Sequence, residues 1–163
     1  MSTTRASDIE YLRKTIAVAA NAKARGNHPF GAILVDGEGK VVAEGENTFL
    51  IDRGPGHAET NLARLAARTF DATYLESCTL YTSVEPCCMC AGTIYWANIG
   101  AVVFGMTEQR LREITQGHAE NETQDLPCTV VFGAGQHKVE VRGPFDELAE
   151  EIAQQHIGFW SNR

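Results

Sequence analysis

The stretch VEPCCMC, residues 84–90, constrains the fold more than any other part of this sequence. Three of the chain's five cysteines, Cys87, Cys88 and Cys90, lie within it, directly after the mostly apolar segment CTLYTSV. A short apolar run of this kind indicates a strand. Pro86 fits just before or at the first position of a helix, where its missing N–H does no harm. We therefore expect a strand to end and a helix to begin at the cysteine cluster.

The size and composition indicate one globular domain over residues 1–163. Hydrophobic residues make up 44% and charged residues 21% of the chain, a balance typical of globular proteins. No run of about 18 apolar residues is present to span a membrane, and the N-terminal segment lacks the apolar core of a signal peptide. We expect a cytoplasmic protein with reduced thiols, in which clustered cysteines point to metal or redox work before disulfides.

The charge pattern favours a small molecule as the partner. The formal net charge is −7, and no tract of Lys and Arg occurs. Proteins that grip long nucleic acids normally carry a basic face. A nucleic-acid partner is therefore the weaker expectation, although scattered basic residues could still assemble a patch in the folded protein.

Strands and helices alternate along the chain, which predicts a layered α/β domain. Ser7 and Glu10 fit a capping box at the start of an N-terminal helix that Gly26 ends. The segment PFGAILVDGEGKVVAEGEN predicts a β-hairpin around a tight DGEGK turn, so we expect a mixed sheet. The segment LPCTVVFGAG fits either a strand or a helical turn. Further helices are expected at about 57–70, 87–97, 108–117 and 145–156, and further strands at 78–84, 100–106 and 137–143.

His57, in the stretch GPGHAET, completes a set of metal ligands with Cys87 and Cys90. One imidazole and two thiolates suit zinc, which takes nitrogen and sulfur ligands in a tetrahedral arrangement. Cys87 and Cys90 are three residues apart, so both sulfurs can reach one ion from the start of a helix. The helix N-terminus also favours the thiolate form. Cys88 is turned about 100° away from Cys87 and is a poor ligand.

Three protein ligands leave the fourth position open, which is typical of a catalytic zinc site. Zinc lowers the pKa of a water in that position to roughly 7. Glu59 lies two residues after His57 and points to another side of a helix. It is therefore poorly placed as a further ligand and well placed to move protons to and from the water. A purely structural zinc site is the alternative, and it would need a fourth protein ligand.

These motifs resemble the zinc-dependent cytidine deaminase superfamily. HAE at residues 57–59 followed by PCCMC at 86–90 is similar to that family's signature. HPFGA and IYWA are most similar to bacterial guanine deaminases, and EPCxMCAG and VVFG to bacterial tRNA adenosine deaminases. The resemblance implies a three-layer α/β/α cytidine deaminase-like fold, with a mixed five-stranded sheet flanked by helices.

The resemblance also implies roles for individual residues. His57, Cys87 and Cys90 match the ligands of one zinc ion per subunit, and Glu59 matches the proton shuttle. Guanine deaminases carry an acidic pocket residue after the fourth strand, for which the candidates here are Glu120, taken first, Glu122 and Asp125. The expected substrate contacts are Asn47, the backbone N–H of Ala58, and the aromatic rings of Phe30 and Trp96.

The implied reaction is hydrolytic deamination of a nucleobase or nucleoside, with release of ammonia. Guanine is the first-choice substrate, from IYWA and the absence of a basic tract, and it would place the enzyme in purine metabolism. Cytosine or another aminated base, and the adenosine of a tRNA, are the alternatives. A zinc-stabilised binding module without turnover is an alternative of another class. The family further implies a homodimer, in which Phe159 and Trp160 of the C-terminal segment either serve the partner's pocket or pack on their own sheet.

Overall fold

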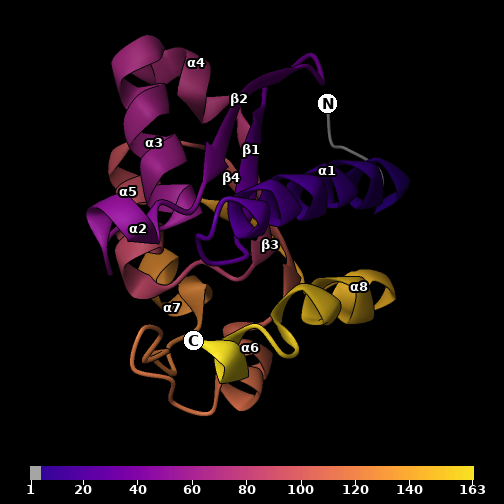
Figure 1. Cartoon of the computed structure of the whole chain (residues 1–163). Helices are drawn as coiled ribbons and strands as arrows, with labels where there is room; N and C mark the ends of the chain where they lie inside the picture. Colours follow the sequence, from indigo (N-terminus) through magenta and orange to yellow (C-terminus); the bar gives the residue numbers. More distant parts are fainter. Residues whose placement is uncertain (1–4) are drawn as a thin grey trace.

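A five-stranded sheet in the order β2-β1-β3-β4-β5 forms the centre of the computed structural model, which describes residues 5–163 (Figure 1). β1 runs antiparallel to β2 and to β3, whereas β3, β4 and β5 run parallel to one another. The expected mixed sheet of five strands is thus confirmed. The strands are β1 (Gly31–Val35), β2 (Val41–Glu46), β3 (Thr79–Val84), β4 (Ala101–Met106) and β5 (Glu140–Arg142).

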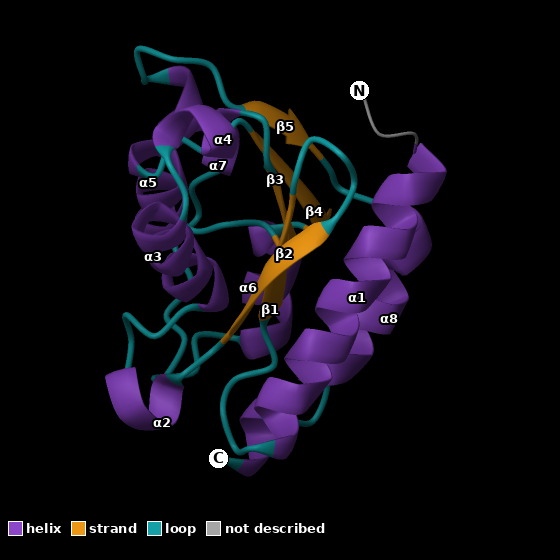
Figure 2. Ribbon diagram, turned by 90° about the horizontal axis from the view of Figure 1, so that it is seen from above, coloured by secondary structure: helices purple, strands orange, loops and turns teal. Residues whose placement is uncertain are grey.

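Helices cover both faces of this sheet, which confirms the three layers (Figure 2). One layer contains α1 (Arg5–Ala24) and α8 (Asp146–His156). The opposite layer contains α3 (Ala58–Thr69), α5 (Cys88–Trp96) and α7 (Cys128–Gly133). All residues of β1 and β4 are buried, as expected for strands covered on both sides. None of the helices within residues 5–163 has the length and apolar character needed to cross a membrane.

Three local expectations are changed by the structure. Ser7 lies inside α1, whose described part begins at Arg5, so the capping box at Ser7 does not mark the helix start. The ambiguous apolar segment is the helix α7, which begins after Pro127. Three short helices were not expected: α2 (Phe49–Asp52), α4 (Ala72–Glu76) and η1 (Trp160–Asn162). The helix α6 (Glu108–Thr115) lies within the range expected for it.

Gly26 ends the first helix as predicted. Its φ of +86° is left-handed, a conformation that glycine adopts at little cost. Its N–H donates to the Lys23 carbonyl at 3.0 Å, and the Asn27 N–H donates to the Ala22 carbonyl at 3.0 Å. This pair of hydrogen bonds satisfies carbonyl groups that the helix end leaves open.

The sheet brings one end of each of its four longer strands to a single edge. β3 and β4 end there at Val84 and Met106, which pair with each other. Because β1 is antiparallel to β3, it begins at this edge with Gly31, opposite the last residue of β2, Glu46. Ligands of α/β proteins bind outside the carboxyl ends of parallel strands. The side chains next to these ends are therefore the first candidates for a site.

Close packing of β2 against α3 fixes one side of that edge. A Cβ atom on Gly45 would lie 2.5 Å from the Ala58 carbonyl oxygen and 2.7 Å from Leu62 Cβ. Only glycine at this position lets the first turn of α3 approach the strand so closely. The start of α3, where His57 lies, is positioned by this contact.

Candidate active site

Three side chains that can hold a metal ion converge at the starts of α3 and α5. His57 is the N-cap of α3 and Cys87 is the N-cap of α5, and Cys90 lies in the first turn of α5. His57 Nδ1 is 3.5 Å from Cys87 Sγ and 3.4 Å from Cys90 Sγ. The three ligand atoms all lie within 4.8 Å of one another, and within residues 5–163 no fourth His, Cys, Asp or Glu joins this group.

The donor set and its spacing fit zinc. A tetrahedral ion with Zn–S bonds of about 2.3 Å and Zn–N bonds of about 2.0 Å holds sulfur and nitrogen ligands about 3.5 Å apart. The two helix N-termini add positive potential that favours thiolates. Thr60 Oγ1 also donates a hydrogen bond to Cys90 Sγ at 3.3 Å, and outer contacts of this kind orient metal ligands.

The charges at the group also suit a cation. Hydrogen bonds from Cys90 and His57 lower the pKa of Cys87 to about 4, against the effect of burial. Burial opposes a charge on His57, but its hydrogen bond with Cys87 and the negative charges of Cys87 and Glu59 outweigh this and raise the pKa of His57. Negative charge therefore resides on the sulfur of Cys87, whereas the hydrogen bond with Cys87 raises the pKa of Cys90. The sulfur is the atom through which cysteine binds zinc.

Glu59 lies beside the metal-binding group in the first turn of α3 and is almost fully buried. Thr82 Oγ1 donates a hydrogen bond to Glu59 Oε1 at 2.7 Å, and Glu59 Oε2 lies 3.6 Å from Cys90 Sγ. Burial raises the pKa of Glu59, against the charge of His57 and the hydrogen bond from Thr82. A buried carboxylate with raised proton affinity is suited to general acid–base work.

A pocket reaches the metal-binding group from the strand edge. The Phe30 ring stands nearly parallel to the His57 ring, with centroids 6.5 Å apart. Three lining residues, Glu108, Leu111 and Asn121, have no role in the sequence prediction. Glu108 had a signal in the sequence, because it follows the buried strand β4 at its carboxyl end. The full lining is Phe30, His57, Glu59, Val84, Glu85, Cys87, Glu108, Leu111 and Asn121.

Glu85 and Glu108 are neighbouring acids in this lining. Both carboxylate oxygens of Glu85 accept hydrogen bonds, whereas Oε2 of Glu108 accepts none from the described residues. Glu85 Oε1 accepts from the Cys128 N–H at 2.9 Å, and Glu85 Oε2 accepts from the Glu108 N–H at 3.1 Å. Glu85 thus links the end of β3 to the starts of α6 and α7. Glu108 is 5% exposed as a residue, and its Oε2 has no hydrogen-bond partner within the described chain.

Asn47 and Ala58 lie close to the strand edge but are not among the residues that line the pocket. Asn47 is buried, and its Oδ1 accepts hydrogen bonds from the backbone N–H groups of His28 and Phe49, at 3.2 and 2.9 Å. Asn47 therefore closes the turn after β2. Ala58 is the first residue of α3, where a backbone N–H has no partner within the helix.

Trp96 is not a wall of the pocket within this chain. It is the last residue of α5 and is 86% exposed on the outer helical layer. The helix turns its side chain away from the sheet, so the expectation drawn from IYWA is corrected here.

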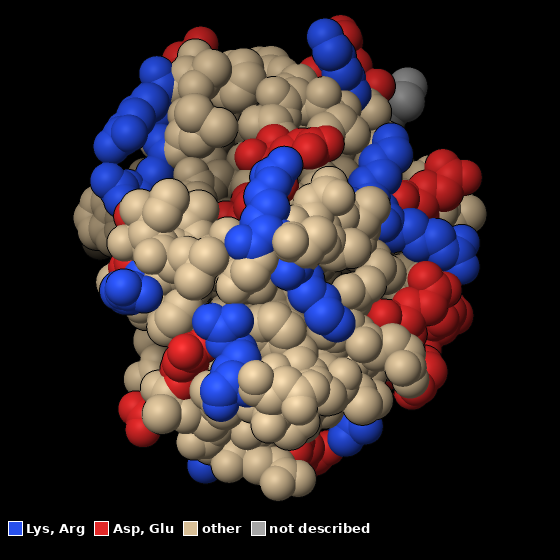
Figure 3. Space-filling model, in the orientation of Figure 1, with Lys and Arg blue, Asp and Glu red and all other residues tan. Residues whose placement is uncertain are grey.

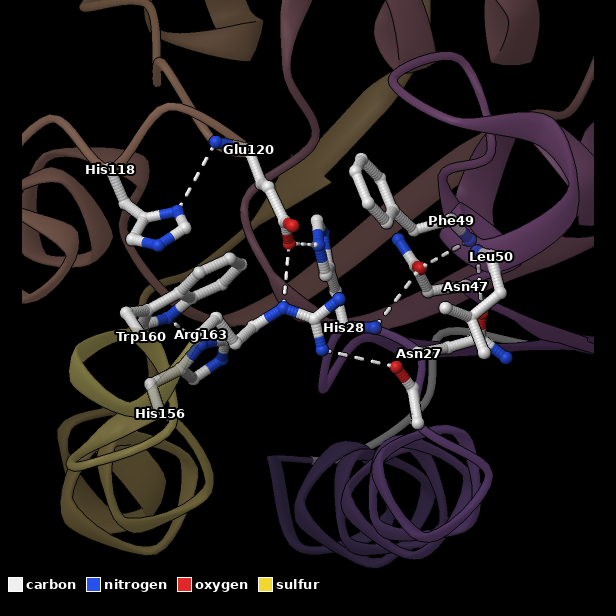
Figure 4. A network of polar contacts seen from close by, with 11 residues as sticks. Asn27, His28, Asn47, Phe49, Leu50, His118, Glu120, His156, Trp160 and Arg163 are labelled. Carbon is white, nitrogen blue, oxygen red and sulfur yellow. Dashed lines mark hydrogen bonds and ion pairs between the residues drawn. The ribbon is translucent and has the colours of Figure 1, made fainter.

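Glu120 lies at the mouth of the site and pairs with basic groups (Figure 4). Its Oε2 accepts from His28 Nε2 at 3.0 Å and from Arg163 Nε at 2.6 Å. Of the other two candidate acids, Glu122 lines an outer groove and Asp125 pairs with Arg112 at 3.5 Å. None of these three acids lines the inner pocket, whereas Glu108 does.

The C-terminal segment covers the site from the side of β1. Trp160 is buried, and its Nε1 donates to His156 Nδ1 at 3.3 Å. The Phe30 ring lies 4.9 Å from the His156 ring and 6.3 Å from the Trp160 ring, measured between centroids. Arg163 Nη1 donates to the Gly26 carbonyl at 3.1 Å. Trp160 therefore packs against its own chain, next to Phe30 of the pocket wall.

Known proteins are similar to this chain in sequence and in fold. Residues 5–106 match the family model described as cytidine and deoxycytidylate deaminase zinc-binding region. A "Probable cytosine deaminase" of Schizosaccharomyces pombe is 39% identical over 98% of both chains. A tRNA-specific adenosine deaminase of Haemophilus influenzae is 36% identical over 96% of this chain and 84% of its own. A solved guanine deaminase from Nitrosomonas europaea shares the fold, with a TM-score of 0.66, 21% identity and coverage of 90% of this chain and 82% of the other.

Proposed function

Because the chain belongs to the cytidine and deoxycytidylate deaminase zinc-binding family and is a hydrolytic deaminase, we propose that it acts on a free nucleobase, with cytosine as the first substrate. The observation that carries this proposal is the single pocket in which His57, Cys87 and Glu59 meet an aromatic wall. Binding sites for small planar ligands combine apolar or aromatic walls with a few polar groups that fix the ligand's orientation, and Phe30, Glu59 and Glu108 supply both kinds here.

In this proposal, Glu59 moves the protons. Zinc, when bound by His57, Cys87 and Cys90, supplies a Lewis acid that acidifies a coordinated water. Glu59 takes a proton from the attacking water and gives it to the ring nitrogen beside the amine, which makes the adjacent carbon electrophilic. The carbon–oxygen bond forms, Glu59 then takes the proton of the new hydroxyl group and passes it to the amine, and the carbon–nitrogen bond breaks to release ammonia while the carbonyl forms. The hydrogen bond from Thr82 keeps the carboxylate oriented for both transfers.

The surroundings of the pocket favour a free base over a polynucleotide. The groove beside the pocket is lined by Glu108, Glu120 and Glu122, and no Lys or Arg belongs to its described lining. The groove therefore offers a phosphate backbone none of the basic side chains that nucleic-acid sites use. On the face seen in Figure 3, basic side chains lie singly or in small groups between acidic and uncharged ones. A contiguous basic surface for an anticodon loop is not seen on that face.

Cytosine replaces guanine as the first choice because one argument for guanine no longer holds. That argument placed Trp96 against the base, and Trp96 is on the outer surface. The S. pombe protein, similar over 98% of both chains, carries the name "Probable cytosine deaminase". Guanine remains the next substrate to test.

A substrate panel on zinc-loaded protein tests the proposal. Ammonia release is measured with cytosine, guanine, adenine, their nucleosides and an anticodon stem-loop. We expect cytosine to give the highest kcat/KM. Turnover of the stem-loop alone would establish a tRNA deaminase instead, and no ammonia from any compound would favour a zinc-stabilised binding module.

We also propose that the protein is a homodimer formed through the outer layer of α3, α5 and α7. Leu65, Trp96 and Val130, one on each helix, are 49%, 86% and 57% exposed. The three helices lie side by side, because α3 contacts α5 and α5 contacts α7. Exposed large apolar side chains on adjacent elements are typical of a protein–protein interface.

A further inference from the structure

We propose that Glu108 is a further substrate-binding residue, whose carboxyl accepts a hydrogen bond from the ring N–H that a free base has and its nucleoside lacks. This inference rests on the proposed function and deepens it, because it gives the pocket a means to prefer bases over nucleosides. In a nucleoside, that ring nitrogen carries the sugar and has no hydrogen to donate.

The first argument is the hydrogen bonding of Glu108. Its side chain lines the pocket together with His57 and Glu59, and the residue is 5% exposed. Its Oε2 has no partner within the described residues. A buried polar atom without a partner is destabilising, and native proteins rarely keep one without a reason. A bound ligand that donates a hydrogen bond would satisfy this oxygen.

The second argument is elimination among the acids of the pocket. Glu59 is held by Thr82 beside the metal-binding group and is assigned to proton transfer. Both oxygens of Glu85 are occupied by backbone N–H groups of Cys128 and Glu108. Glu108 is the remaining carboxyl in the lining, and its Oε2 has no hydrogen-bond partner within the described residues.

The position of Glu108 is fixed rather than free. It is the first residue of α6, directly after the N-cap Thr107, whose side chain accepts from the Arg110 N–H at 3.1 Å. The backbone N–H of Glu108 is held by Glu85. Two anchors at the start of a helix give the carboxyl a defined place in the pocket wall, which a specific contact requires.

The protonation of Glu108 is compatible with this role. Burial, together with the charges of Cys87, Glu85 and Glu59, raises the pKa of Glu108 to about 8. A protonated carboxyl keeps a carbonyl oxygen that accepts a hydrogen bond, and a carboxylate has two. Acceptance from a ring N–H is therefore available in either form.

The test compares two substrates that differ only at the ring N–H. Zinc-loaded wild type, Glu108→Leu and Glu108→Gln are assayed for ammonia release from cytosine and 1-methylcytosine. Guanine and 9-methylguanine form the matching pair if guanine is the substrate. Glu113→Gln is the control, because Glu113 is an exposed acid of the same helix that pairs with Arg110.

We expect wild type to prefer the unmethylated base by about tenfold or more, the effect of one hydrogen bond to a buried group. Glu108→Leu should lose that preference by lowering kcat/KM for the unmethylated base alone. Glu108→Gln retains an acceptor and should lie between the two. The melting temperature of Glu108→Leu should rise by about 2–4 °C, because an unpaired buried carboxyl is removed.

A structural role would give a different pattern. A lower melting temperature with equal losses on both substrates would overturn the inference, and so would unchanged selectivity in Glu108→Leu. Either result leaves wild-type turnover of the free base, and hence the proposed function, intact. Wild type that releases ammonia from no free base would instead overturn both proposals.

Discussion

At the scale of single residues, Glu59 carries the chemistry. We predict that Glu59→Gln binds zinc like wild type but loses at least about 100-fold in kcat, because the amide cannot take a proton. Its shape is unchanged, and its oxygen can still accept the hydrogen bond from Thr82. Metal content by mass spectrometry and ammonia release are measured on the same preparation. A variant that retained its turnover would remove Glu59 from the mechanism.

The cysteines of the cluster differ in their distance from the metal site. Cys88 Sγ donates to Gln124 Oε1 at 2.7 Å and does not join the group with His57. We predict that Cys87→Ala or Cys90→Ala loses zinc together with activity, whereas Cys88→Ala keeps one zinc ion per chain. The three variants are compared by metal analysis after identical purification. Full zinc content in Cys87→Ala or Cys90→Ala would refute the ligand set.

The sequence predicts the metal-binding group better than the rest of the pocket. His57, Cys87 and Cys90 are prescribed by local spacing at two helix starts, which is a property that the sequence displays directly. Glu108 depends on which strand ends meet, and the orientation of Trp96 depends on the turn that ends α5. Contacts of this kind arise from tertiary packing, so the sequence leaves them open.

At the scale of elements, periodic segments are predicted well and short ones are not. The strands and the longer helices follow their apolar patterns to within a few residues. The helices α2 and α4 have four and five residues, too short to show a helical period. The segment of α7, CTVVFG, is short and mostly apolar, so it shows no helical period, and its helix packs against α5.

Two buried histidines, His156 and His28, make the stability of the fold depend on pH. Burial lowers the pKa of His156 to about 3 and that of His28 to about 4. The unfolded chain takes up a proton at each histidine below about pH 6.5, whereas the folded chain does not. The stability from these groups is therefore present above pH 7 and is lost as the pH falls toward 4.

We predict that His156→Gln reduces this loss. For His156, the free energy of unfolding should fall by about 2 kcal/mol between pH 7 and pH 5. The glutamine cannot titrate, and its amide oxygen can accept from Trp160 Nε1 in place of the ring nitrogen. Urea unfolding at both pH values measures the difference. His137→Gln, at an exposed position before β5, serves as the control and should keep the wild-type pH dependence. Equal pH dependence in His156→Gln and wild type would contradict the prediction.

At the scale of the whole molecule, the two helical layers have different tasks. In the layer of α1 and α8, the helix α8 leads into the C-terminal segment (Figure 1), whose Trp160 lies next to Phe30 of the pocket wall. The layer of α3 and α5 holds the metal ligands at its helix starts and exposes Trp96 at the far end of α5. A dimer contact on this second layer would bury Trp96 without covering the pocket mouth near Glu120.

We predict that Trp96→Glu converts a dimer into a monomer. A charge at the centre of an apolar contact is destabilising because it is desolvated without a partner. Light scattering coupled to size-exclusion chromatography gives the mass over a range of protein concentrations. Ile157→Glu is the matched control, since Ile157 is 52% exposed but follows α8 on the opposite layer, and it should remain a dimer. Wild type that stays monomeric at high concentration, or a dimer that survives Trp96→Glu, would rule out this surface as the interface.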